Sequence, residues 1–107
     1  MWSHFERSLP MSTYLVAFFI SDFESTTLPV TAGGTQIKIW ARREMLPYTQ
    51  YAAEITPRIF KFYEEFFKLP YSLPKLDLVA VPDMAVGAME NWGEKFLTKI
   101  QLEFINL

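Results

Sequence analysis

The period of hydrophobic and polar positions changes twice along the chain. Residues 12–24 are centred on an unbroken apolar run, residues 14–20, made largely of residues that favour strands. Such a run predicts a strand that is covered on both faces. Residues 35–41 instead alternate, with Ile37 and Ile39 on one face and mostly polar residues on the other. This alternation predicts a second, half-exposed strand that pairs antiparallel with the first.

A helix is predicted where the spacing of apolar residues lengthens to three and four. After a loop at residues 26–34 and a break at residues 42–47, apolar side chains recur at Ile55, Ile59, Phe62 or Tyr63, and Phe66. The opposite face carries charged residues, namely Glu54, Lys61, Glu64, Glu65 and Lys68. Glu64 lies four residues before Lys68, the orientation that favours an ion pair on a solvated helix face.

Pro57 lies inside this helical pattern and leaves two starting points open. Either Thr56 caps a helix whose first residue is Pro57, or a longer, kinked helix begins near Tyr51. We favour the longer helix. It must end before Pro70, because the residue that precedes a proline is disfavoured in helical geometry.

The remaining residues predict short extended segments. Residues 70–74 form a stiff connector, residues 76–81 form a third strand, and the Pro-Asp pair that follows closes it. Residues 85–92 are a candidate fourth extended segment. Residues 94–107 fit a short amphipathic helix as well as a strand, because their apolar residues have mixed spacing.

Composition and charge exclude several classes of function. The chain has 107 residues, with 12 acidic and 10 basic side chains and no cysteine. Its near-neutral balance argues against a nucleic-acid binder, which needs a basic face. The absence of cysteine excludes disulfides and thiolate metal sites. The longest apolar run is far shorter than the roughly 20 residues that cross a bilayer, so no membrane span is predicted.

The candidates for metal binding and catalysis are few. His4 is the single histidine, and zinc sites require three or four ligands from histidine, cysteine and acidic residues. No metal ligands and no catalytic residues are therefore predicted in this chain. Asp83 is expected to be a turn residue.

Glu90 stands out among the acidic residues because of its neighbours. It lies in a stretch of small residues and glycines, residues 87–93, whose backbone is open to close approach. Such a backbone can accept a peptide as an added strand, and a carboxylate at its end can bind a terminal ammonium group. A surface loop with one charge and a packed Trp92 is the simpler alternative, and composition alone favours it.

The string Gly87-Ala88-Met89-Glu90-Asn91 resembles the exopeptidase signature of the gluzincin zinc aminopeptidases, the family of aminopeptidase N and the endoplasmic-reticulum aminopeptidases. Further similar strings occur in the family's order before it, from about Phe5 onward. They are residues 11–18, 21–23, 62–64, 70–75, 77–78 and 81–83. The similarity runs to Gly93 and stops there.

The resemblance implies an α+β fold built from parts of two domains. Residues 1–43 would be the end of an N-terminal β-saddle domain, and residues 44–107 would begin a thermolysin-like catalytic domain with a divergent tail at residues 94–107. Glu90 would bind the free α-ammonium group of a peptide. Gly87, Ala88 and Met89 would present an edge strand, with Met89 also flanking the first side-chain pocket, and Asn91 would hold the loop.

The family's zinc ligands and catalytic residues follow the signature, and no matching positions are found in this chain. Zinc is therefore expected in the parent family but not on this chain. We expect a fragment of a zinc metalloaminopeptidase, inactive alone, that retains the anchor for peptide N-termini. The alternatives are a non-catalytic module that binds peptide N-termini, a partner or decoy of the full enzyme that associates with its remainder, and a chain without a stable fold. The resemblance implies the plasma membrane or the secretory lumen and leaves the cytoplasm open.

Overall fold

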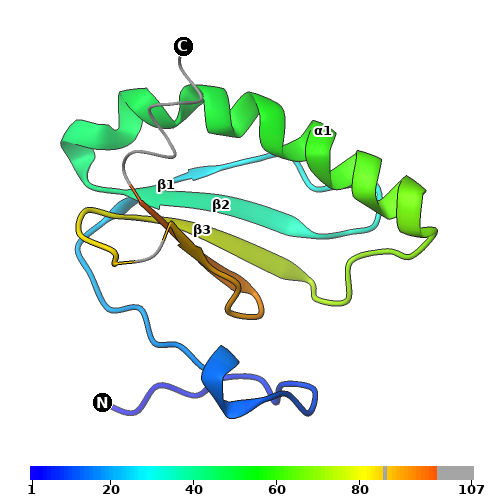
Figure 1. Ribbon diagram of the computed structural model, residues 1–107. Coiled ribbons are helices and arrows are strands. Elements are labelled where there is room, and N and C mark those ends of the chain that lie inside the picture. Colours follow the sequence, from blue (N-terminus) through cyan, green and yellow to red (C-terminus); the bar gives the residue numbers. More distant parts are fainter. Residues whose placement is uncertain (86, 99–107) are drawn as a thin grey trace.

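A long helix lies across one face of a mixed sheet in the computed structural model, which describes residues 1–85 and 87–98 (Figure 1). The strands are β1 (Glu24–Thr27), β2 (Gln36–Ala41), β3 (Lys75–Val81), β4 (Ala88–Met89) and β5 (Glu94–Thr98). The helices are α1 (Gln50–Phe67) and the short 3-10 segments η1 (Thr13–Leu15) and η2 (Arg43–Thr49). The predicted α+β class is confirmed.

Strand order in the described part of the sheet is β1-β2-β3-β5-β4. β2 and β3 are parallel, as are β3 and β5, whereas β1 and β4 each pair antiparallel with their neighbour. Parallel strands need a long crossover connection, and α1 supplies it between β2 and β3. β1 and β4 are therefore the two edges of this sheet.

The hydrophobic core lies between α1 and the sheet. β2 alternates as predicted, with Ile37 and Ile39 fully buried, and Leu76 and Leu78 of β3 lie beside them. The predicted strand at residues 76–81 is confirmed. Ala52 of α1 is buried against this cluster. A small side chain at that position lets the helix approach the sheet closely.

The predicted first strand, residues 12–24, is wrong except for Glu24. Residues 13–15 form η1, and the partner of β2 is β1, which includes residues expected in a loop. A tight turn sets this pairing, because Gly34 N–H donates to the Thr31 carbonyl at 2.9 Å and the chain returns at once. The apolar run has no cover on its outer side, where Phe18 and Ile20 are 82% and 96% exposed.

The longer helix is confirmed, and a helix that starts at Pro57 is wrong. α1 continues through Pro57, which cannot donate a backbone hydrogen bond to the preceding turn. The helix ends before Pro70 as predicted. Lys68 follows it in the left-handed conformation with φ +54°, and its N–H donates to the Glu64 carbonyl.

The predicted buried face of the helix is wrong except for Ile55, which is half-buried. Ile59, Phe62, Tyr63 and Phe66 are exposed among the described residues, and the core side carries Ala52 and Phe60 instead. Glu64, expected on the solvated face with Lys68, is half-buried. An ion pair does form on the exposed face, between Lys61 and Glu65 at 3.8 Å.

The C-terminal predictions are confirmed in part. The fourth extended segment is a strand only at β4, two residues long. The tail is a strand at β5 rather than a helix, and residues 99–107 lie outside the described part of the chain.

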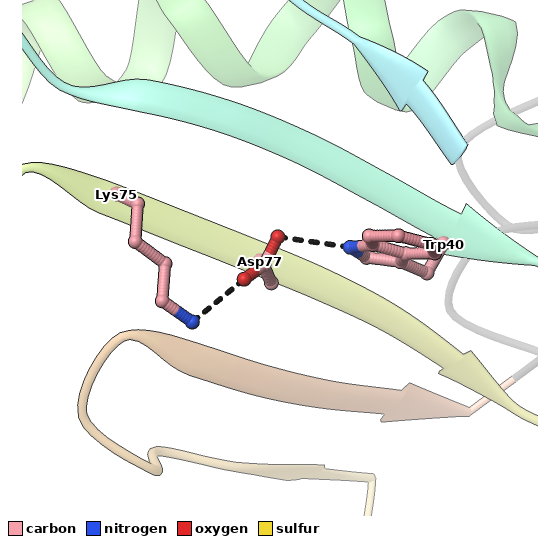
Figure 2. Close-up of polar contacts among 3 residues, drawn as sticks. All are labelled: Trp40, Lys75 and Asp77. Carbon is pink, nitrogen blue, oxygen red and sulfur yellow. Dashed lines mark hydrogen bonds and ion pairs between the residues drawn. The ribbon is translucent and has the colours of Figure 1, made fainter. Parts of the chain in front are cut away.

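The second face of the sheet carries a polar contact that joins β2 to β3. Trp40 Nε1 donates to Asp77 Oδ1 at 2.8 Å, and Lys75 Nζ lies 2.6 Å from Asp77 Oδ2 (Figure 2). Phe19 covers Trp40 from the N-terminal segment, with ring centroids 6.2 Å apart. One oxygen of the Asp77 carboxylate therefore binds Trp40 of β2, and the other binds Lys75 of β3.

We predict that Asp77→Ala lowers the free energy of unfolding by about 1–2 kcal/mol, because Trp40 loses a charge-assisted hydrogen bond. Urea unfolding followed by tryptophan fluorescence measures this change. The exposed Asp83→Ala is the control and should change stability by less than about 0.5 kcal/mol. Equal midpoints for the two variants would contradict a structural role of Asp77.

Candidate functional site

The candidate site begins at the outer edge of the sheet. Ala88 and Met89 of β4 pair with Leu97 and Phe96 of β5, and in the described residues no strand lies on the other side of β4. Ala88 and Gly87 are exposed, and Met89 is half-buried. The outer side of this strand therefore offers backbone groups that a peptide can pair with.

Glu90 follows this edge strand directly and is exposed. Its carboxylate has no hydrogen-bond or ion-pair partner within residues 1–85 and 87–98. The nearby Trp92 is half-buried, but it does not remove Glu90 from solvent. The site thus presents a solvated negative charge at the end of an open strand edge.

Asn91, next in the chain, is buried and ties the loop to the N-terminal segment. Its side-chain Nδ2 donates to the Leu15 carbonyl at 3.1 Å, across 76 positions of sequence. Its Oδ1 is buried without a partner among the described residues. An unpaired buried oxygen costs about 1–3 kcal/mol. This cost opposes the stabilisation that the loop gains from the hydrogen bond between Asn91 and Leu15.

Trp92 and Gly93 are held by residues that precede and begin β3. Trp92 Nε1 donates to Ser72 Oγ at 3.2 Å, and Asp77 N–H donates to the Gly93 carbonyl at 2.9 Å. Gly93 has φ +87°, and a Cβ there would lie 3.2 Å from Leu73 Cδ1. Both conformation and close packing therefore require glycine at this position.

Glu64 and Tyr71 form a second group that the sequence pattern did not reveal. Glu64 Oε1 accepts the Tyr71 backbone N–H at 2.8 Å, and the same oxygen would lie 2.9 Å from a Cβ on Gly33. Burial raises the pKa of the Tyr71 hydroxyl above its usual 10.0, and a hydrogen bond from the Gly93 backbone offsets part of that rise. The only sequence signal for this group was that the charged face of the helix is interrupted by Phe60, which lies four residues before Glu64 and packs against the core.

An open apolar cavity of about 710 Å³ lies between the second half of α1 and β3. Its wall includes Ile59, Tyr63 and Phe67 from the helix, Leu69 and Tyr71 from the connector, and Leu76 from the strand. The helix side of this cavity is continuous with the exposed aromatic residues of α1.

The residues present do not fit a zinc ion. Within the described ranges, no group of three or more histidine, cysteine or acidic side chains is placed to hold a metal. His4 is exposed in the N-terminal segment. Nor does the described part of the chain contain a helix long and apolar enough to cross a bilayer.

An edge strand with a carboxylate at its end is the kind of site that binds peptides. Residues 51–105 match the Peptidase family M1 domain, so this chain belongs to the M1 zinc aminopeptidase family. The match begins in α1 and includes Glu90. It continues to residue 105, so the expectation that the similarity stops at Gly93 is wrong. The resemblance drawn from the signature string is therefore confirmed.

Curated relatives agree with this assignment. The chain is 47% identical over 90 residues to endoplasmic reticulum aminopeptidase 1 of Homo sapiens. The aligned residues make up 84% of this chain and 10% of that protein. It is 45% identical over 95 residues to glutamyl aminopeptidase of Bos taurus, with 87% and 10% coverage. The chain thus spans about a tenth of the length of these relatives.

Gly93→Ala is predicted to destabilise the chain more than Gly34→Ala does. Both glycines have φ +87°, so both variants carry the same backbone strain, of about 1–2 kcal/mol. Only Gly93 has Leu73 against the added methyl group, which should add about 0.5–1 kcal/mol. Urea midpoints of the two variants measure the difference, and equal midpoints would show that the Leu73 contact yields freely.

Stability should also fall at high pH because of Tyr71. A raised folded-state pKa means that the unfolded chain releases this proton first, so stability is intact below pH 10.0 and declines as the pH rises through the folded-state value. Chemical unfolding at a series of pH values from about 8 to about 11, a range that brackets the usual tyrosine pKa of 10.0, measures the decline. Tyr71→Phe should reduce it, whereas Tyr63→Phe should not. A decline that is the same in both variants would contradict the assignment to Tyr71.

Proposed function

We propose that this chain carries the part of an M1 zinc aminopeptidase that binds the N-terminus of a peptide substrate. Glu90 pairs with the free α-ammonium group, and the backbone of Gly87, Ala88 and Met89 pairs with the peptide as an added strand. The observation that carries this proposal is the position of β4 at an edge of the sheet, with exposed Glu90 immediately after it.

Strand addition and the ion pair with Glu90 recognise different parts of the peptide. Strand addition is independent of side chains, because it uses backbone N–H and carbonyl groups. Glu90 supplies the preference for a free amine, since acetylation removes the charge. Met89 flanks the first side-chain pocket, and Asn91 holds the loop, a role that its bond to Leu15 supports.

The affinity of the isolated chain should be low. An exposed carboxylate–ammonium pair contributes only about 0–1 kcal/mol, and Glu90 is exposed. Its contribution would grow where surrounding protein excludes water from the site. We therefore place the function of this segment within a larger catalytic body, with residues 1–43 ending a β-domain and residues 44–107 beginning the catalytic domain.

Zinc in this family supplies a Lewis acid and an activated water for peptide hydrolysis. The donor set of these 107 residues, with one histidine and no cysteine, does not fit that ion. We infer that the chain contributes substrate binding and that hydrolysis requires ligands from elsewhere. As a fragment, it would then be inactive alone.

The anchor is tested with Leu-Gly-Gly and its N-acetylated form by calorimetry or NMR titration. The chain should favour the free amine up to about fivefold, and Glu90→Gln should abolish that preference. Glu6→Gln, an exposed carboxylate far away in sequence, is the matched control. An unchanged preference in Glu90→Gln would reject Glu90 as the anchor.

Inactivity alone is tested by metal analysis of the purified chain and an aminoacyl-arylamide assay with added zinc. We expect no stoichiometric zinc and no turnover above the buffer. One bound zinc with turnover that a chelator abolishes would overturn this part of the proposal.

A second candidate function is association with the remainder of an M1 enzyme. The exposed aromatic residues of α1 favour it, because Phe62 stacks on Phe66 and Tyr63 on Phe67 at centroid distances of 5.9 Å without further cover among the described residues. Contiguous apolar surface of this kind marks interaction sites. Size-exclusion chromatography with an M1 body that lacks this segment tests it, and Phe62→Glu should prevent co-elution.

A further inference from the structure

The loop that carries Glu90 is fixed immediately after that residue. Asn91 binds Leu15, Trp92 binds Ser72, and Gly93 binds the backbone of Asp77. Glu90 itself is exposed and has no such contact among the described residues. The position of Glu90 therefore depends on the contacts that hold the three residues after it, Asn91, Trp92 and Gly93.

Two consecutive residues of the connector between α1 and β3 supply much of that support. Ser72 Oγ accepts from Trp92 Nε1 at 3.2 Å, and Leu73 packs against Gly93. Both contacts join segments about 20 positions apart in the sequence.

The connector is itself held on both sides. From the helix, Glu64 accepts the Tyr71 N–H at 2.8 Å, and Phe60 packs edge-on against the Tyr71 ring at 5.1 Å. From the start of β2, Thr35 Oγ1 donates to the Leu73 carbonyl at 3.2 Å. Thr35 is almost fully buried, so this last bond is shielded from water.

We propose that Ser72 is a positioning residue for the Glu90 anchor, because it joins the loop that carries Glu90 to the connector that α1 and β2 hold. This inference rests on the proposed function of Glu90. Ser72 does not contact the peptide in this arrangement; it acts through Trp92.

The physical reason is preorganisation. Fixing the backbone of a residue carries an entropic cost, and a loop that is already fixed does not incur that cost when a ligand binds. Loss of a single hydrogen bond corresponds to about a 2- to 10-fold change in the population of the ordered loop. Loss of the Ser72 hydroxyl should therefore loosen the loop without removing the anchor.

The first experiment measures order in the loop of the full chain by NMR hydrogen exchange. Ser72→Ala should speed exchange of the Trp92 indole N–H by about 2- to 10-fold. Ser72→Thr keeps the hydroxyl and should restore the rate of the unaltered chain. The control Ser25→Ala alters an exposed serine elsewhere and should leave that rate unchanged.

The second experiment measures the preference for Leu-Gly-Gly over its N-acetylated form. Ser72→Ala should lower that preference, by up to about fivefold, toward equal binding of the two peptides, and Ser72→Thr should restore it. Ser25→Ala should bind like the unaltered chain.

The outcomes separate this inference from the proposed function. If Glu90→Gln abolishes the preference but Ser72→Ala retains the full preference and the unaltered exchange rate, the positioning role is overturned and the anchor stands. If the unaltered chain shows no preference for the free amine, the anchor fails, and the link from connector to ligand binding is overturned with it. Faster exchange together with a lower preference, reversed by Ser72→Thr, supports the proposal.

Discussion

The parallel pairing of β2 with β3 is the contact on which the rest of the structure depends. It forces a crossover, which α1 provides, and it aligns Ile37 and Ile39 with the buried residues of β3 on the helix side. On the other side, the Asp77 carboxylate bonds to Trp40 across the same pair of strands. The Asp77 backbone N–H also donates to the carbonyl of Gly93, the residue before β5. Asp77 therefore links the core to the candidate site.

From this pair of strands the edge that carries the candidate site is built outward. β5 adds to β3 in parallel, and β4 folds back antiparallel to become the edge. The short turn between β4 and β5 leaves Glu90 in solvent while Asn91 is buried. The chain belongs to peptidase family M1, and an open edge with an adjacent carboxylate supports the proposal that the segment binds a peptide by its charged end.

Local pattern predicted the elements whose environment is simple. β2 alternates because one face is buried, and β3 is apolar over residues 78–81, where the neighbouring Leu78 and Val79 are both buried. The run at residues 14–20 is also apolar, yet it forms no strand, because the turn after β1 pairs β2 with residues 24–27 instead. The helix packs through Ala52 and Phe60 rather than through its exposed aromatic residues, because close approach to the sheet favours a small side chain at Ala52. Glu90 came from a family signature, whereas the local pattern gave Ser72 no role, since its partner Trp92 lies 20 positions away.

The central claim is that a peptide binds along β4 with its amino group at Glu90. Intermolecular NOEs between an isotope-labelled chain and unlabelled Leu-Gly-Gly test it most directly, because they report which protons lie close to the bound peptide. Contacts from the peptide backbone to the amides of Ala88 and Met89, with the first residue nearest Glu90, are the predicted result. Contacts confined to the apolar cavity beside α1, around Tyr63 and Phe67, would contradict it.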